Sequence, residues 1–396
     1  MGGLKPIVAV ALFLWVSFGI AQKSFPKGVV IDSVPIAQNA KESFTLYLPS
    51  SFEPNNPSSI IFIFDPAARS KIGIRPFIKA SEKYGHILVC SKNSKNGPHE
   101  QNFGIANRLF SHVFSNFSIK ADEMYLAGFS GGSRLASSIA TLTDRFAGVI
   151  ACGAGFSGGA GHRPSFQDFD YVGLCGDEDF NFREMFENQN YLDIMNFDQT
   201  LLTFSGGHGW PASDDIIRAC DWLFVQFEKK KDSPDKAMLN TLFEEEKIRI
   251  SDLNNNILLK AQAYERVILL FRSVFDVQKL EQEYEKITHS KEYKNASKLQ
   301  NTILKQEGAL ISRFVKRWQV DLMNPTNANY AWWEKEFDKL TQKRGSEDTR
   351  KMVRRIVSNI GALTYERFYG DTNTPPQEEY LQNLLSLLPK GPGRIN

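Results

Sequence analysis

Residues 124–134 read MYLAGFSGGSR, an apolar segment that passes through Gly-Phe-Ser-Gly-Gly into good helix formers. A G-x-S-x-G sequence between a strand and a helix is typical of a nucleophile elbow. The sharp turn requires strained backbone angles at Ser130, and side chains at Gly128 or Gly132 would collide across it. Amides at the start of the following helix would face a reacting carbonyl. The segment therefore predicts Ser130 as a nucleophile on an α/β sheet.

The same five letters, GFSGG, recur at residues 155–159. This copy also follows an apolar segment, but it leads into AGHRP, which does not begin a helix cleanly. Ser130 is therefore favoured over Ser157, which is expected in a loop.

A serine nucleophile needs a base, and the base needs a carboxylate to orient it. His208 lies in FSGGHGWP, directly after the last expected strand, where glycines let an imidazole reach the edge of the sheet. Asp179 ends the turn GDED after the preceding strand, at the spacing best suited to return a carboxylate toward His208. We expect Asp179 to be the acid, with Asp177 as the alternative.

Short β-branched segments alternate with helix-like segments over about the first half of the chain, which predicts a mostly parallel sheet with helices on both faces. Strands are expected at 29–34, 43–48, 60–64, 87–90, 124–127, 148–152, 171–175 and 200–204. Helices are expected at 74–83, 102–117, 133–142, 182–194 and 214–227.

The alternation stops at residues 228–235, EKKKDSPD, which have the composition of a linker. Beyond them, apolar residues recur at spacings of three and four, as in amphipathic helices. The sequence therefore predicts an α/β domain at 22–227 and an all-helical domain at 236–396, which could bind a protein partner. An aromatic group in the helical part is expected to be core, with a binding surface as the alternative: Phe314, Trp318, Tyr330, Trp332 and Trp333.

The elbow, the GDED turn and the GGHGWP loop, in that order, resemble the α/β-hydrolase superfamily. Within it they are similar to secreted esterases related to polyhydroxybutyrate depolymerases, feruloyl esterases and dienelactone hydrolases. The resemblance covers about half the chain and implies an eight-stranded sheet. It also implies hydrolysis of carboxylic esters by Ser130, Asp179 and His208, without a metal or organic cofactor.

The turn after the third expected strand departs from that pattern. Such esterases often have His-Gly there, whereas this chain has Asp65-Pro66-Ala67. An oxyanion hole needs backbone N–H groups, and Pro66 has none. We expect the Gly131 amide to be one donor and the Ala67 amide to be the second, with the Asp65 carboxylate turned away into a hydrogen bond.

The composition excludes several other classes of protein. Lys and Arg number 47 against 45 Asp and Glu, a net charge of +2, which gives no broad field for binding nucleic acid. The 4 cysteines form no CxxC pair, and no metal site is expected. All four lie in or beside apolar segments, which predicts buried free thiols.

The N-terminus has the pattern of a signal peptide at 1–21, with one Lys, an apolar core of about 15 residues and a small-residue site ending at Ala21. The apolar core is shorter than the roughly 20 residues of a membrane-spanning helix, although a retained anchor stays open as an alternative. No Cys near the site offers lipid anchoring. We expect a secreted or periplasmic protein with no stable membrane insertion after cleavage.

The expected substrate is a small-molecule or polymer-attached ester, and the expected enzyme is a serine carboxylesterase. The loop between the strands at 148–152 and 171–175 is too short for a lid domain, so an open cleft is expected, although a lid from the C-terminal helices stays open as an alternative. His99 and His162 lie in loops and are candidates for substrate contacts. Two other functions stay open: a non-catalytic exported binding protein and a serine peptidase.

Overall fold

The protein is described by a computed structural model that covers residues 25–159, 161–253, 256–343, 345–370 and 372–389. The segment predicted as a signal peptide lies outside these residues. Within them, no helix is both long enough and apolar enough to cross a membrane.

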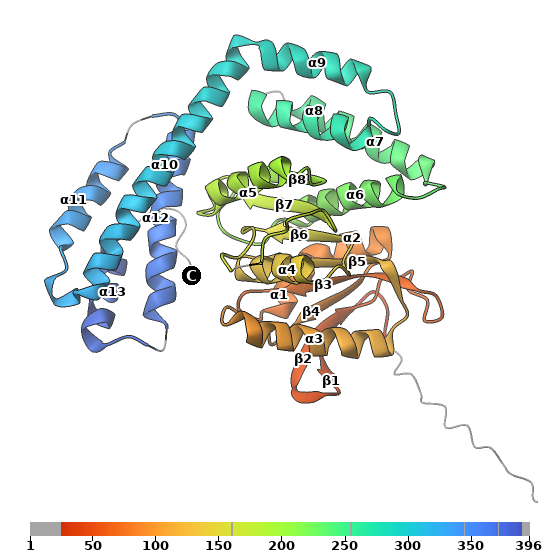
Figure 1. The fold of residues 1–396 in the computed structure, drawn as a ribbon, viewed down its shortest axis with the longest axis horizontal. Coiled ribbons are helices and arrows are strands. Elements are labelled where there is room, and N and C mark those ends of the chain that lie inside the picture. The colour runs from red at the N-terminus through yellow and green to blue at the C-terminus, as the bar shows by residue number, and fades with distance from the viewer. Residues whose placement is uncertain (1–24, 160, 254–255, 344, 371, 390–396) are drawn as a thin grey trace, which may run out of the picture.

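Eight strands form one sheet in the order β1-β2-β4-β3-β5-β6-β7-β8 (Figure 1). The strands are β1 (Val30–Ile36), β2 (Asn39–Tyr47), β3 (Ser58–Phe64), β4 (Ile87–Ser91), β5 (Ile119–Phe129), β6 (Gly148–Cys152), β7 (Asp170–Gly176) and β8 (Gln199–Phe204). Strand β2 runs antiparallel to both β1 and β4, and the other neighbours are parallel. The predicted fold class is confirmed.

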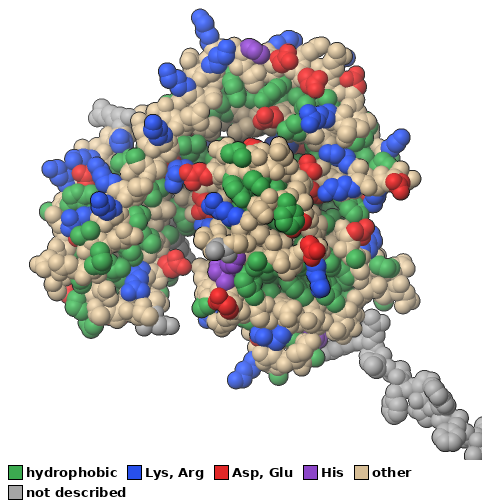
Figure 2. Space-filling view, viewed as in Figure 1, with side chains coloured by type: hydrophobic (Ala, Val, Ile, Leu, Met, Phe, Trp, Pro, Cys, Tyr) green, Lys and Arg blue, Asp and Glu red, His purple; other side chains and the backbone are tan. Residues whose placement is uncertain are grey.

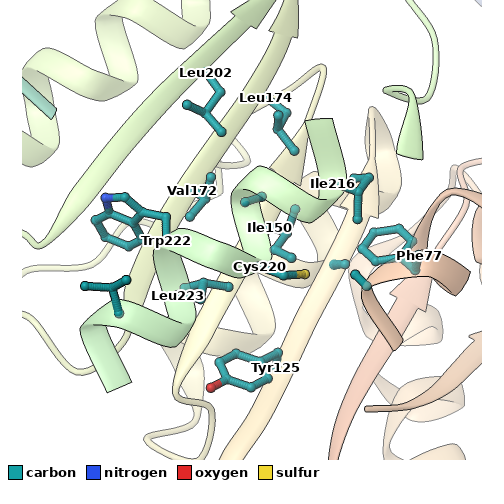
Figure 3. Packing of buried hydrophobic residues seen from close by; sticks show 14 of the residues in the cluster. Phe77, Tyr125, Ile150, Val172, Leu174, Leu202, Ile216, Cys220, Trp222 and Leu223 are labelled. Carbon is teal, nitrogen blue, oxygen red and sulfur yellow. The ribbon is translucent and has the colours of Figure 1, made fainter. Parts of the chain in front are cut away.

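Helices cover both faces of this sheet. They are α1 (Ser70–Ile74), α2 (Ile78–Tyr84), α3 (His99–Asn116), α4 (Gly131–Leu142), α5 (Phe182–Ile194) and α6 (Ser213–Lys229), with a 3-10 turn η1 (Arg75–Phe77) between α1 and α2. One face packs against α1, α2 and α6, and the other packs mainly against α3 and α4. Figure 3 shows the first face, where Trp222 and Leu223 of α6 lie over Val172 and Ile150 of the sheet.

The helical half continues with α7 (Lys236–Asp252), α8 (Ile257–Phe271), α9 (Gln278–His289), α10 (Lys291–Met323), the 3-10 turn η2 (Pro325–Asn327), α11 (Tyr330–Thr341), α12 (Glu347–Phe368) and α13 (Pro375–Leu387). The prediction of a helical C-terminal region is confirmed.

The hydrophobic cores do not divide at the predicted linker, however. Leu242 of α7 and Val267 of α8 belong to the same cluster as Trp222 of α6 and the sheet. Residues 228 and 229 end α6, and residues 230–235 form a mostly exposed turn between helices that share one core, so the composition of this segment marks a surface turn and not a boundary between cores.

A separate core is formed by α10, α11, α12 and α13. Phe314, Trp318 and Trp333 are buried in it, and Tyr330 and Trp332 pack against it. The predicted core role of this aromatic group is confirmed. The four cysteines are likewise free and buried, as predicted.

Candidate active site

The elbow between β5 and α4 has the geometry that its sequence requires. Ser130 adopts φ 53° and ψ −121°, in a region that side-chain-bearing residues rarely occupy. A Cβ on Gly128 would lie 2.2 Å from Gly132 O, and one on Gly132 would lie 2.1 Å from Phe64 O. The glycines therefore let β5, α4 and the end of β3 approach closely enough to hold Ser130 at the edge of the sheet.

A chain of hydrogen bonds joins three of the predicted site residues. His208 Nε2 lies 3.0 Å from Ser130 Oγ, and His208 Nδ1 lies 2.8 Å and 2.9 Å from the two oxygens of Asp179. The Asp179 side chain is 1% exposed, whereas that of His208 is 17% exposed. The buried carboxylate therefore contacts one imidazole nitrogen, while the other nitrogen faces the serine hydroxyl.

Aromatic rings hold the imidazole from two sides. The Phe129 and Phe180 ring centroids lie 4.6 Å and 4.1 Å from that of His208. The Asn181 amide donates to Asp179 Oδ1 at 2.8 Å, which gives the carboxylate a second hydrogen bond. These contacts limit the orientations available to both side chains.

The alternative acid, Asp177, is directed elsewhere. Its Oδ1 accepts the Gly206 amide at 3.1 Å, and its Oδ2 pairs with Lys351 of α12 at 2.5 Å. Asp177 therefore braces the turn, and Asp179 is the carboxylate of this turn that contacts His208.

The second GFSGG copy forms a different arrangement. Ser157 Oγ lies 2.5 Å from His162 Nδ1, but Ser157 is 3% exposed. Among the described residues no carboxylate forms a hydrogen bond or ion pair with His162. Ser157 is thus a buried loop residue with a histidine neighbour but no orienting acid.

The turn after β3 differs from the sequence-based prediction in one respect. The Asp65 carboxylate is fully buried and accepts hydrogen bonds from the Ala67 amide (2.9 Å), from Arg69 and from Trp210 Nε1 (2.9 Å). Burial alone would raise the pKa of Asp65, but these bonds outweigh it and hold the pKa below its ordinary value.

The Asp65 carboxylate therefore forms hydrogen bonds away from the nucleophile, as predicted. One of these bonds, however, comes from the Ala67 amide. The prediction of Ala67 as the second oxyanion donor is wrong in this geometry, because its N–H is already donated to Asp65. The Gly131 amide has no acceptor within the helix, since Gly131 is the first residue of α4. This amide remains a candidate oxyanion donor.

A pocket of about 530 Å³ opens beside Ser130 and Gly131. One wall comes from the α/β part, and the other comes from Ile311 and Val315 of α10 and from Leu363 of α12. Figure 2 shows the surface hollowed between the helical part and the sheet. The site is therefore not the simple open cleft predicted for a chain without a cap, because α10 and α12 stand opposite the serine.

Helix α12 also contacts the turn that carries Asp179 through two arginines. Arg355 Nη1 donates to Asp177 O at 2.7 Å, and Arg354 pairs with Glu178 at 2.8 Å. Arg355 in turn forms a buried ion pair with Glu307 of α10. The sequence offered no signal for these contacts beyond the basic character of the segment KMVRR, because Glu307 lies 48 residues away from Arg355 and the partners in the turn lie more than 170 residues away.

Two further pocket residues come from the loop after β4 and from the first residue of α3. His99, considered above as a candidate for substrate contact, lines the pocket, and so does Asn96, which the sequence did not single out. In the described part of the chain, no group of three or more His, Cys, Asp and Glu side chains could hold a metal ion.

No family model matches the sequence, and no curated protein matches it. Among solved structures, the chain is similar to S-formylglutathione hydrolase from Staphylococcus aureus, with 17% identity and a TM-score of 0.39 over 46% of this chain and 90% of that one. It is also similar to a feruloyl esterase module from Clostridium thermocellum, with 15% identity and a TM-score of 0.38 over 46% of this chain and 83% of that one. Both alignments leave more than half of this chain unmatched.

Proposed function

We propose that the protein is a serine hydrolase of the carboxylesterase type. The observation that carries the proposal is the continuous hydrogen-bonded chain from Ser130 Oγ through His208 to the buried Asp179. A strained nucleophile at a helix N-terminus, a histidine in reach and an oriented carboxylate are the parts that acyl transfer needs.

In the proposed reaction, Ser130 Oγ attacks the ester carbonyl carbon while His208 Nε2 takes the hydroxyl proton. Asp179 stabilises the imidazolium that forms, and the Gly131 amide faces the carbonyl oxygen as it gains negative charge. Collapse of the tetrahedral intermediate breaks the bond to the alcohol, which leaves with the proton from His208. Water, whose proton His208 takes, then attacks the acyl-enzyme carbon. Collapse breaks the bond to Ser130 Oγ, which takes the proton from His208 as the acid is released.

The substrate is proposed to be an ester whose acyl or alcohol part lies between the sheet edge and helices α10 and α12. Apolar contacts are available from Phe180, Ile311, Val315 and Leu363, and polar contacts from Asn359 and His99. We also keep export, directed by residues 1–21, as part of the proposal.

The test uses purified protein, beginning after residue 21, with a panel of p-nitrophenyl esters of increasing acyl length. We expect release of p-nitrophenol by the wild type and loss of turnover in a folded Ser130→Ala variant. Ser157→Ala is the matched control and should retain turnover. Full turnover in Ser130→Ala would refute the assignment, and cleavage of amide substrates in preference to esters would favour the peptidase alternative. A wild type without turnover and without fluorophosphonate labelling would favour the binding-protein alternative.

A further inference from the structure

The turn after β3 leaves the oxyanion site short of a donor. Pro66 has no N–H, and the Ala67 and Arg69 amides donate to the Asp65 carboxylate. The Ala68 amide donates to the backbone oxygen of Asp65 at 3.1 Å. Each of the four residues after Asp65 thus lacks a free backbone donor, so a second donor must come from another segment.

The Asn96 side chain lies against Gly131, the residue after the nucleophile. A Cβ built on Gly131 would fall 1.8 Å from Asn96 Oδ1 and 2.9 Å from Asn96 Cγ. The carboxamide therefore occupies the space of the missing Gly131 side chain, against the residue whose amide is the first candidate donor. Asn96, Ser130 and Gly131 line the same pocket.

The backbone around Asn96 is held firmly beside the turn after β3. The Asn96 amide donates to Pro66 O at 2.7 Å, and Lys95 forms a β-bridge with Ala67. The buried Asn102 side chain bonds both the amide (3.2 Å) and the carbonyl (2.9 Å) of Lys95. The loop thus presents Asn96 at a fixed place, as preorganised catalysis requires.

The Asn96 carboxamide, in contrast, has no hydrogen-bond partner among the residues that the structure describes. A half-turn of the group exchanges its oxygen and its NH₂, so either end can face the reacting carbonyl. A developing negative charge selects the end with two N–H donors, at little cost because no bond within the described structure is broken.

We propose that Asn96 is a catalytic residue that donates Nδ2–H to the oxyanion, beside the Gly131 amide. When the Ser130 Oγ to carbon bond forms, the carbonyl π electrons move to the oxygen, and the two donors stabilise that charge. When the bond to the alcohol breaks, the electrons return and the carbonyl re-forms. Asn96 itself neither gains nor loses a proton.

This inference rests on the proposed ester hydrolysis, and its test keeps the two apart. With the best ester of the panel, kcat and KM are measured for wild type, Ser130→Ala, Asn96→Ala and Asn96→Asp. Removal of one oxyanion donor lowers kcat on the order of 10²- to 10³-fold. We expect that loss in Asn96→Ala with KM changed only a few-fold, and at least that loss in the isosteric Asn96→Asp, which places a carboxylate beside the oxyanion.

Asn93→Ala is the matched control on the same loop. The Asn93 side chain bonds Lys41 O and the Ser43 amide, so it braces the loop without lining the pocket. Its removal should lower kcat less than about tenfold, in line with a structural contact. A trifluoromethyl ketone, which forms an oxyanion with the serine, should bind Asn96→Ala more weakly by the same factor as the loss in kcat/KM.

Three results would overturn the inference: an unchanged kcat in folded Asn96→Ala, a rise in KM alone, or an equal loss in Asn93→Ala. Each of them leaves the proposed function standing if Ser130→Ala is inactive. A wild type that neither hydrolyses esters nor reacts with a fluorophosphonate would refute the proposed function, and this inference would fail with it.

Discussion

Asp177 and Asp179 are two residues apart, yet their carboxylates face opposite parts of the molecule. Asp179 contacts His208, and Asp177 contacts Lys351 and the Gly206 amide. We expect Asp179→Asn to lower kcat by up to about 10⁴-fold, the effect of losing the orienting acid in serine proteases. Asp177→Asn should lower stability by about 1 kcal/mol or less, because its ion pair is partly exposed. Steady-state kinetics and thermal melting of both variants separate the roles, and a larger kinetic loss in Asp177→Asn would reverse them.

Asp65 predicts a pH dependence of stability. Its pKa is lowered in the folded protein, so the ionised carboxylate stabilises the fold above the unfolded-state pKa of about 4. That stabilisation is lost as the pH falls through the lower folded-state pKa. The isosteric Asp65→Asn variant should therefore be destabilised by about 1–3 kcal/mol at neutral pH.

The difference in stability between wild type and Asp65→Asn should begin to narrow as the pH falls below about 4, where Asp65 of the unfolded chain takes up a proton while the folded carboxylate is still ionised. Urea unfolding of both proteins at pH 7, 5 and 3.5 measures the difference in their free energies of unfolding. A difference that is constant or grows with acid would show that the ionised Asp65 is not a stabilising group.

At the residue scale, the sequence predicted Ser130, His208 and Asp179 because each follows a recognisable strand and a glycine-rich turn. It also predicted that Asp65 would turn away from the oxyanion. It could not predict the use of the Ala67 amide, since that depends on a carboxylate also held by Trp210, which lies far away in the sequence. The same limit applies to Asn96, because its place beside Gly131 depends on contacts between the loop after β4 and the turn after β3.

At the scale of elements, the two GFSGG segments offer a direct comparison. A Cβ on Gly132, the fifth residue of the first copy, would overlap the backbone oxygen of Phe64, whereas a Cβ on Gly159, the fifth residue of the second copy, would meet only the His162 ring, at 2.6 Å. Gly132→Ala should destabilise the protein by about 1–3 kcal/mol or more and lower activity, because backbone must move to relieve the overlap. Gly159→Ala should destabilise the protein less than Gly132→Ala, by about 1 kcal/mol or less, because Gly159 is exposed and its neighbour is a side chain that can move.

Denaturant unfolding and ester hydrolysis of both variants provide the measurement. Equal effects in the two copies would contradict the assignment of the first copy as the tight elbow. The element scale is where prediction from sequence was most complete, since every predicted strand and helix of the α/β part overlaps an observed one. Periodicity and glycine turns are local signals, so they do not depend on distant contacts.

At the scale of the whole molecule, Arg355 of α12 links α10 to the turn that carries Asp177 and Asp179. Its side chain and that of Glu307 are 4% and 0% exposed, and Arg355 also donates to Asp177 O. Arg355→Met would leave Glu307 buried without its partner, which should cost about 3–5 kcal/mol. The double variant Arg355→Met/Glu307→Met should recover much of that stability.

Both variants should have lower kcat than the wild type, because each lacks the Arg355 bond that steadies the turn before Asp179. Chemical unfolding and ester kinetics are the measurements. A double variant less stable than the single one would contradict the ion-pair account, and unchanged kcat in both would show that α12 does not position the acid.

The packing of the helical half against the α/β half was the feature that the sequence predicted least well. The sequence separated an α/β half from a helical half, but it placed the division at 228–235, whereas α7 and α8 share the core of the sheet. The sequence pattern of an amphipathic helix indicates that one face is buried, but it does not indicate which element covers that face. For the same reason the sequence left open whether the C-terminal helices lie over the site, where α10 and α12 line the pocket.

The measurement that tests the central claim most directly is covalent trapping of the nucleophile. The purified protein is treated with a fluorophosphonate, digested and analysed by mass spectrometry, with Ser130→Ala, His208→Ala and Ser157→Ala in parallel. We predict one modified residue, Ser130, with no label in Ser130→Ala, slow labelling in His208→Ala and normal labelling in Ser157→Ala. Labelling at another serine, or ester hydrolysis without label on Ser130, would contradict the account.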